Sequence, residues 1–249
     1  MTKYSTLTNA PIAEAIIDIR LDHSEIIDLK KLKDITEKLK DQYPKIDNKY
    51  VHNLKNEFTP DGTVTSENNS QHIGYICRST DGRHVIQLST TGFIISELKP
   101  YSDWNKFSDE AKRIWNIFVD ATSCERVSRV ALRYINQMPM HIDEGEELSL
   151  YLACAPEVPK GLPQGLSMFL NRMRIRDETK VIWADITSSM SILENQESNV
   201  NLLLDIDAFI VRSVNVSEPD FWSYFEQLRD FKNDIFYKTV TKKTLERFE

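Results

Sequence analysis

Two aspartates in the segment LLLDIDAF carry the clearest chemical signal in this chain. Asp205 and Asp207 stand two residues apart in a run of strand-forming residues, so their side chains share one face of the strand. Two carboxylates on one face can bind Mg²⁺ or share a proton, as in some polymerase and nuclease sites. The alternative is the solvent-facing side of a strand whose apolar residues point inward. Because no third carboxylate stands at a defined spacing, we favour this second, structural interpretation.

The segment RYIN offers a second group of polar side chains. Arg133 and Asn136 lie toward the end of a predicted strand, where they can hydrogen-bond a carboxylate, a phosphate or a peptide group. Tyr101 and Trp104 stand at the start of a predicted helix and offer an aromatic surface to a partner. Helical spacing instead places Trp104 mostly in the core, and Arg133 has an ion pair within the fold as its structural alternative. The candidate binding residues are Arg133, Asn136, Tyr101, Asp205 and Asp207, and we predict no catalytic residue.

Other catalytic and cofactor motifs do not occur in the sequence. The five histidines show no HxxxH or HxH spacing, and the three cysteines form no CxxC pair. There is no GxSxG motif, Walker loop or GxGxxG. We therefore predict neither a metal site nor a cofactor. Widely separated cysteines in an odd number fit a reducing compartment.

The composition is that of an ordinary globular protein. The chain has 249 residues, of which 41% are hydrophobic and 28% charged, and this excludes a disordered chain. The formal net charge of −7 argues against general nucleic-acid binding, where a basic face normally supplies the affinity. No apolar run approaches the roughly 18–20 residues that span a bilayer, and the start has no apolar signal core. We expect a soluble cytoplasmic protein with no membrane partner.

A small basic cluster near the end of the chain could still contact nucleic acid. Its cations alternate with aromatic residues, a pattern that suits nucleic acid or an acidic protein surface. A solvated helix end, with cations favourably placed at its C-terminus, explains the cluster as well. The cations are Lys238, Lys242, Lys243 and Arg247.

The predicted elements occur twice in the same order. Strand, helix, three strands and helix follow one another, and the series begins again with the strand over 126–137. The first helix of this second series, over 144–153, has a weaker pattern than the other predicted helices. Matched positions, such as Ser102 and Ser217 at the starts of two helices, lie 115 residues apart. We predict an internal duplication, with coincidence among common elements as the alternative.

These elements predict an α+β fold. Each half, 1–122 and 123–249, is expected to be a βαβββα-like unit of mostly antiparallel sheet, with long amphipathic helices packed on it. The two halves pack as one unit. A continuous sheet and a small closed barrel both fit the pattern. The large aromatic faces of the helices could also support a homodimer.

The duplication also predicts a contact between the first strands of the two halves. If they pair antiparallel, Glu14 falls opposite Arg133 and Asp18 falls opposite Arg129. Both charge pairs are then complementary in one register, and cross-strand ion pairs contribute about 0.2–1 kcal/mol each. We therefore predict that the two strands are sheet neighbours joined by two structural ion pairs.

Five segments stand out along the chain: NAPIAEAIIDIR, RHVIQLSTTGFIISELKPYSDW, SRVALRYINQMP, LLLDIDAF and LRDFKNDIFYKTVTKKTLERF. In this order, and with the motifs NAPIxEAxxDIR, PYxxW, RYIN and LDID, the chain resembles a sporadically distributed prokaryotic family of proteins of about this length and of unknown function. The resemblance covers nearly the whole chain and implies no activity, substrate or catalytic residue. The patchy distribution of the family implies an accessory gene, such as one in a phage-defence or toxin–antitoxin locus.

Two classes of function follow from these observations. We favour a non-enzymatic binding or regulatory protein whose partner is another protein, because no catalytic constellation outweighs its structural alternative. The other class is a metal-dependent hydrolase, or an enzyme that processes nucleotides or nucleic acid, with Asp205 and Asp207 at its centre and Arg133 assisting.

Overall fold

The computed structural model describes residues 4, 7–58, 64–143, 145–192 and 199–249, with side chains except in 53–58 and 64–68. Within these ranges nine strands form one antiparallel sheet. The strands are β1 (Ile12–Leu21), β2 (Lys45–Phe58), β3 (Val64–Arg78), β4 (His84–Ser89), β5 (Gly92–Leu98), β6 (Arg126–His141), β7 (Met168–Asp177), β8 (Ile182–Ile192) and β9 (Asn199–Asn215). The helices are α1 (Leu29–Leu39), α2 (Trp104–Thr122), α3 (Ser223–Thr239) and α4 (Lys242–Leu245), with a 3-10 turn η1 (Leu148–Leu150).

The strands lie in the order β2-β3-β4-β5-β1-β6-β9-β8-β7. The middle of the sheet is formed by β1 and β6, with the other strands of the first predicted half on one side and those of the second on the other. The sheet therefore runs without interruption across the predicted boundary between residues 122 and 123. Its edges are β2 and β7, so it is an open sheet and not the closed barrel that the sequence had left as an alternative.

The prediction that the first strands of the two halves are neighbours is confirmed, because β1 and β6 pair antiparallel. The register differs from the expected one by two residues. Ile16 lies opposite Arg133, and Asp18 lies opposite Ala131. A shift of two residues leaves every side chain on the same face of its strand. The charged residues of both strands therefore still share one face.

The predicted α+β fold with long amphipathic helices is wrong. The described chain is mostly one antiparallel sheet, and α1, α2, α3 and α4 have only 11, 19, 17 and 4 residues. The strand expected over 126–137 extends to His141 as β6, and β2, β3 and β9 run for 14, 15 and 17 residues. Their extent is set by pairing with distant strands, which local sequence patterns do not report.

The helix expected over 144–153 is a further correction. Residue 144 lies outside the described residues, and the following segment has a single helical turn, η1. The segment pairs with the end of α3 instead of continuing as a helix. Leu152 forms a β-bridge with Val240, and the Ala153 amide donates to the Thr239 carbonyl over 2.8 Å. The two predicted halves therefore differ in their helices.

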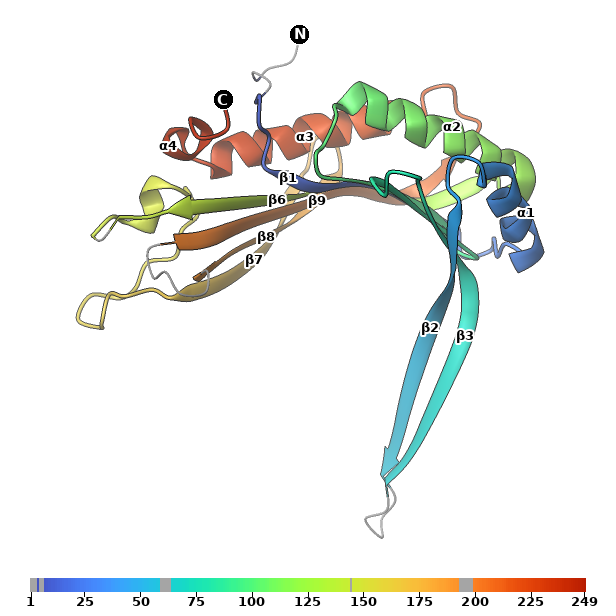
Figure 1. The fold of residues 1–249 in the computed structure, drawn as a ribbon, viewed down its shortest axis with the longest axis horizontal. Helices are drawn as coiled ribbons and strands as arrows, with labels where there is room; N and C mark the ends of the chain where they lie inside the picture. Colours follow the sequence, from blue (N-terminus) through green and yellow to red (C-terminus); the bar gives the residue numbers. More distant parts are fainter. Residues whose placement is uncertain (1–3, 5–6, 59–63, 144, 193–198) are drawn as a thin grey trace.

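The helices pack on one face of the sheet, as Figure 1 shows. Alternate residues of the strands point toward them, since side chains of a strand alternate between its faces. In β1, Ala15, Ile17 and Ile19 are fully buried, whereas the residues between them are partly exposed. The opposite face, which carries side chains such as Asp18 and Arg133, has no helix from the described residues over it. We call it the open face.

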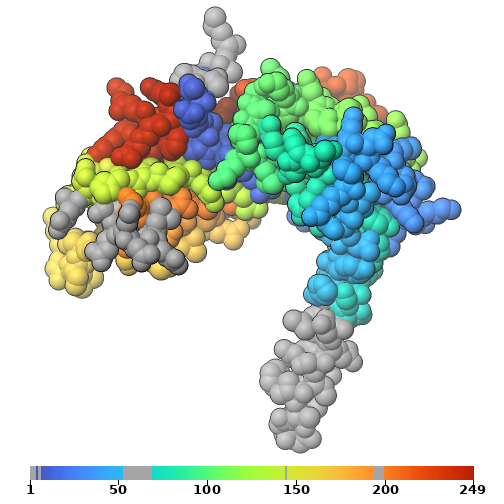
Figure 2. Space-filling model, in the orientation of Figure 1, coloured from blue at the N-terminus to red at the C-terminus, as the bar shows by residue number. Residues whose placement is uncertain are grey.

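The open face is the inside of an arch. Figure 1 shows the hairpin of β2 and β3 extending away from the helices at one end of the sheet, and Figure 2 shows the hollow beneath the middle strands. The helix α2 packs on the convex side of the sheet. It begins at Trp104 because the Asp103 side chain accepts from the Lys106 amide over 2.9 Å and caps the helix. Its buried Trp115 stacks on Phe221, just before α3, with ring centroids 5.9 Å apart.

We expect Gly74→Ala to destabilise the protein, because a Cβ there would lie 1.9 Å from the Leu88 carbonyl oxygen. Overpacking of this kind costs at least about 1–3 kcal/mol. The free energy of unfolding in urea measures the loss. Gly165→Ala is the matched control, because its Cβ would meet no atom within 4 Å. Equal stability of the two variants would contradict the close approach of β3 and β4.

Candidate functional site

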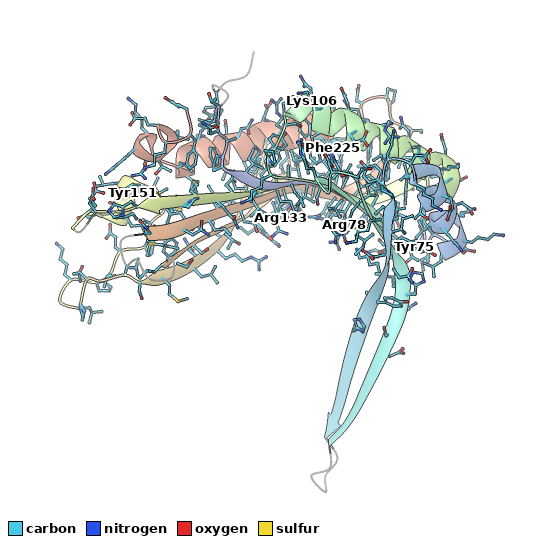
Figure 3. All side chains as sticks on the ribbon, viewed as in Figure 1. Tyr75, Arg78, Lys106, Arg133, Tyr151 and Phe225 are labelled. Carbon is cyan, nitrogen blue, oxygen red and sulfur yellow. The ribbon has the colours of Figure 1, made fainter. Side chains whose placement is uncertain are left out.

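The five predicted binding residues lie on opposite faces of the sheet. Arg133, Asp205 and Asp207 belong to the open face, and Figure 3 shows Arg133 beneath the sheet, away from the helices. Tyr101 and Asn136 line a cavity on the helix-covered face. The structure therefore does not gather the five residues into one site. It presents two separate candidates, which we describe in turn.

On the open face, Arg129 of β6 joins carboxylates from two neighbouring strands. Its Nη1 donates to Asp18 Oδ2 of β1 over 2.6 Å, and its Nη2 donates to Asp207 Oδ2 of β9 over 2.7 Å. The next arginine on this face, Arg133, donates from two nitrogens to Asp205 of β9 over 2.8 and 2.5 Å. Such two-point contacts fix both the position and the plane of the guanidinium.

The partner of Arg133 is therefore Asp205 and not Glu14, with which the sequence had paired it. The cause is the register of β1 and β6, in which Glu14 lies opposite Ile135. The position of Asp205 depends on β9, which pairs with the other side of β6. The ion pair between Asp18 and Arg129 does form across β1 and β6, along a diagonal.

A similar arrangement continues to the edge of the sheet. Asp185 of β8 accepts from Arg174 and Arg172 of β7, with shortest distances of 2.5 and 3.3 Å. The Asp185 side chain is 15% exposed, whereas those of Arg174 and Arg172 are 57% and 70% exposed. For the pair of Asp205 and Arg133 the values are 15% and 43%. At these pairs the carboxylate is more buried than the guanidinium, which faces outward. Arg129 differs, because it is only 18% exposed and its partner Asp207 is 25% exposed.

Aromatic rings support several of these guanidinium groups. Arg129 and Arg174 lie over the Phe209 ring at 4.8 and 5.4 Å, and Arg176 lies over the Trp183 ring at 4.8 Å. A cation above an aromatic face gains about 0.5–1 kcal/mol at exposed sites. The open face therefore presents arginines that are held in place from below and from the side.

This pairing weakens the metal-site interpretation of Asp205 and Asp207. Each carboxylate already accepts hydrogen bonds from an arginine, which a metal ion would have to displace. Burial raises the pKa of Asp207, with Arg129 and Arg133 acting in the opposite direction. In the part of the chain that the structure describes, no group of three His, Cys, Asp or Glu side chains is placed to hold a metal ion.

The second candidate is a cavity of about 1480 Å³ on the helix-covered face. Its walls come from the start of the chain, the segment leading into α2, the strand β6 and the helix α3. Tyr101 and Trp104 line one side, Tyr134 and Asn136 come from β6, and Phe236 comes from α3. Pockets for organic ligands are usually about 300–1,000 Å³. The cavity is therefore large enough for such a ligand.

Lys232 of α3 is the side chain of this cavity that the sequence patterns did not single out. The residue is only 8% exposed, and its Nζ lies 3.8 Å from the centroid of the Tyr134 ring. The Tyr134 hydroxyl forms a hydrogen bond of 2.8 Å with that of Tyr101. Over the described ranges, no carboxylate forms an ion pair with Lys232. Buried lysines without a partner are rare, because desolvating an ammonium group is costly.

The amphipathic pattern of α3 contained the signal that could have revealed Lys232. The buried side of this helix includes Leu228 and Ile235, and Lys232 stands four residues after the first and three before the second. A lysine at such a position either extends its amine to the surface or loses its water. Only the packing of α3 against β6 decides between these outcomes, and here the amine is buried.

The chemistry of the cavity follows from this burial. Burial, and to a smaller extent the neighbouring Arg229 guanidinium, lower the pKa of Lys232 to about 7. Burial also raises the pKa of Tyr101 and of Tyr134 well above the ordinary tyrosine value. At neutral pH the tyrosines are therefore hydroxyl donors, and the lysine is divided between its charged and neutral forms. In its charged form, the Lys232 amine can bind an anion in the cavity.

Comparisons with known proteins do not narrow the function. No family model matches the chain, and no curated protein matches it. Membership of the family that the motifs suggest therefore stays a prediction. None of the helices in the described ranges is long and apolar enough to cross a membrane.

We expect Arg129→Met to lower the free energy of unfolding by about 1–3 kcal/mol, because Asp207 would lose its arginine partner and Asp18 would keep only Arg20. Chemical denaturation at pH 7 measures this loss. Arg176→Met is the control, since that arginine lies over Trp183 at the exposed sheet edge and should contribute less than about 1 kcal/mol. A similar loss in both variants would contradict the central role of Arg129.

A second prediction concerns the pH dependence of stability. The pKa of Lys232 is lowered in the folded state, so between about pH 7 and pH 10.5 the unfolded state binds more protons than the folded one. The wild type should therefore gain stability relative to Lys232→Met as pH rises through this window. Below pH 7 the difference should be constant. Denaturant unfolding of both proteins at pH 6, 8 and 10 measures it, and a pH-independent difference would contradict the burial of the amine.

Proposed function

We propose that this protein is a non-enzymatic binding protein that holds an acidic protein partner against the open face of its sheet. One observation carries the proposal: Arg133, Arg172 and Arg174 are more exposed than the carboxylates that they contact. The difference in side-chain exposure is largest between Asp185, which is 15% exposed, and Arg172, which is 70% exposed. A partner would therefore meet guanidinium groups first.

Ordered arginines suit the recognition of carboxylates. A guanidinium has five N–H donors in a fixed plane, and one contact with an aspartate leaves several donors for a partner. The Asp185 and Phe209 contacts of Arg174 also limit its rotamers before binding. Binding then loses less conformational entropy, which favours affinity. Two exposed apolar side chains on the same strand, Met168 and Leu170, would add contact area.

The charge distribution favours a protein over a nucleic acid. The net charge of −7 opposes long-range attraction of a nucleic acid and of an acidic protein alike, so the distinction rests on the local basic residues. Each basic residue near the end of the chain contacts an acidic side chain or a carbonyl of the same chain, although Lys238 and Lys242 are still exposed. Lys238 pairs with Asp234, Lys242 with Glu246, and Lys243 with Glu146. Arg247 donates to the His141 carbonyl.

A regulatory task is compatible with this binding role. A protein that neutralises or recognises a partner in a phage-defence or toxin–antitoxin locus needs a preformed surface and no catalytic residue. The motif resemblance supports such an accessory role. The metal-dependent hydrolase is the less favoured function, since both of its proposed carboxylates are already bound to arginines.

The proposal predicts that Arg172→Gln combined with Arg174→Gln will weaken binding to an acidic polypeptide at least about tenfold, because two exposed guanidinium groups are lost. Biolayer interferometry with poly-L-glutamate as the probe measures the affinity, with a mixed-sequence DNA duplex as the second probe. Lys106→Gln combined with Lys242→Gln is the matched control. These lysines are 74% and 90% exposed on the helix side, where Figure 3 shows Lys106.

Three results would contradict the proposal. The first is an equal loss of affinity in the control variant, and the second is binding to DNA without binding to poly-L-glutamate. The third is saturable Mn²⁺ binding, measured by isothermal titration, that disappears in Asp205→Ala. That result would favour the hydrolase instead.

A further inference from the structure

We propose that the cavity beside Lys232 binds a small organic anion, whose carboxylate or phosphate group contacts the lysine amine and whose apolar body packs on the aromatic walls. This site lies on the opposite side of the sheet from the open face. It is therefore independent of the protein partner proposed above.

The first argument is the position of the amine. Lys232 is more than nine-tenths buried, and its side chain lines the cavity together with Tyr134, over whose ring the Nζ lies. A lysine that served only to hold the fold would have an acidic partner or reach the solvent. Among the described residues Lys232 has no acidic partner, and it lines the cavity instead of extending to the outer surface. An anion in the cavity would supply the missing counter-charge.

The charged residues that line the cavity include more cations than free carboxylates. From α3 these are Arg229, Asp230 and Asp234, and Asp234 accepts from the Tyr4 hydroxyl over 2.9 Å; Lys180 lies just before β8. Before α2 they are Lys99 and Asp103, and Asp103 is engaged by the Lys106 amide and ammonium. The segment after α4 adds Arg247.

Arg229 strengthens the preference for an anion. Its guanidinium lies 5.5 Å from the centre of the Trp104 ring and 3.4 Å from Glu226, which itself accepts from Trp104 Nε1 over 2.7 Å. A second cation is thus held at the wall of the cavity by a ring and a carboxylate. Lys232 and Arg229 repel each other, and an anion near both would relieve that repulsion.

The other walls indicate an organic ligand rather than an inorganic ion. Tyr101, Trp104, Phe236 and Phe248 line the cavity, whose volume of about 1480 Å³ greatly exceeds that of a phosphate ion. Aromatic walls favour an apolar or aromatic body, and the few polar groups orient its head. The hydroxyl pair of Tyr101 and Tyr134 adds a hydrogen-bond donor for the anionic oxygens.

Binding should be coupled to protonation of the amine. Because the pKa of Lys232 is about 7 in the free protein, a fraction of the molecules carries a neutral amine at pH 7 and above. An anion favours the charged form, so binding takes up a proton. The affinity should then fall about tenfold for each pH unit above 7.

The test uses three probes of similar shape with the full-length protein: phenylacetate, phenyl phosphate and the uncharged phenylacetamide. Isothermal titration at pH 6.0 and 8.5, in buffers of different ionisation enthalpy, gives both the affinity and the number of protons taken up. We expect at least one anion to bind at pH 6.0, to bind at least about tenfold more weakly at pH 8.5, and to take up protons near pH 7.5. Phenylacetamide should bind at least about tenfold more weakly than the anion.

Lys232→Met should reduce the anion affinity at pH 6.0 at least about tenfold, whereas Lys38→Met, an exposed lysine of α1, should leave it unchanged. Proton uptake by the wild type does not depend on how either variant folds. Binding of only one of the two anions would support the proposal and identify the head group. The proposal is overturned if neither anion shows saturable binding in the millimolar range. It is also overturned if the amide binds as well as the anions, or if binding takes up no proton.

Discussion

The antiparallel pairing of β1 with β6 is the constraint on which the rest of the structure depends. Each of these strands begins one side of the sheet, so their hydrogen bonds join what would otherwise be two smaller sheets with exposed inner edges. The two halves are also joined on both faces of the sheet. On the helix-covered face, Trp115 of α2 stacks on Phe221, just before α3, and on the open face Asp18 of β1 pairs with Arg129 of β6.

The strand β6 also links the two candidate sites. Because side chains alternate between the faces of a strand, consecutive residues on β6 serve different sites. Arg133 projects to the open face, where it donates to Asp205. Tyr134 projects into the cavity, where the Lys232 amine lies over its ring. The cavity and the open face are therefore separated by the thickness of one sheet. The position of each depends on the same backbone hydrogen bonds to β1 and β9.

Local patterns were sufficient for some of this fold and not for the rest. The alternation in β1, with Ala15, Ile17 and Ile19 on one side, and the apolar stripe of α2 could be recognised because each lies within one segment. The partner of Arg133 could not, because it requires the position of β9 relative to β6. The length of the long strands depends in the same way on distant pairing. Lys232 was visible as an irregularity in the stripe of α3, yet its burial depends on the packing of that helix against β6.

The two kinds of buried charge in this protein have opposite meanings. Asp18, Asp205 and Asp207 each have an arginine within hydrogen-bond distance, so their charges are compensated and they order the groups around them. Lys232 has the Tyr134 ring beside it but no carboxylate among the described residues, and an apolar side chain of similar size would avoid the loss of hydration. A buried charge that lowers stability without a compensating ion pair is most readily explained by a ligand that binds there. For this reason the partnered aspartates, which first suggested chemistry, are better explained as structure, and the unpartnered lysine is better explained as function.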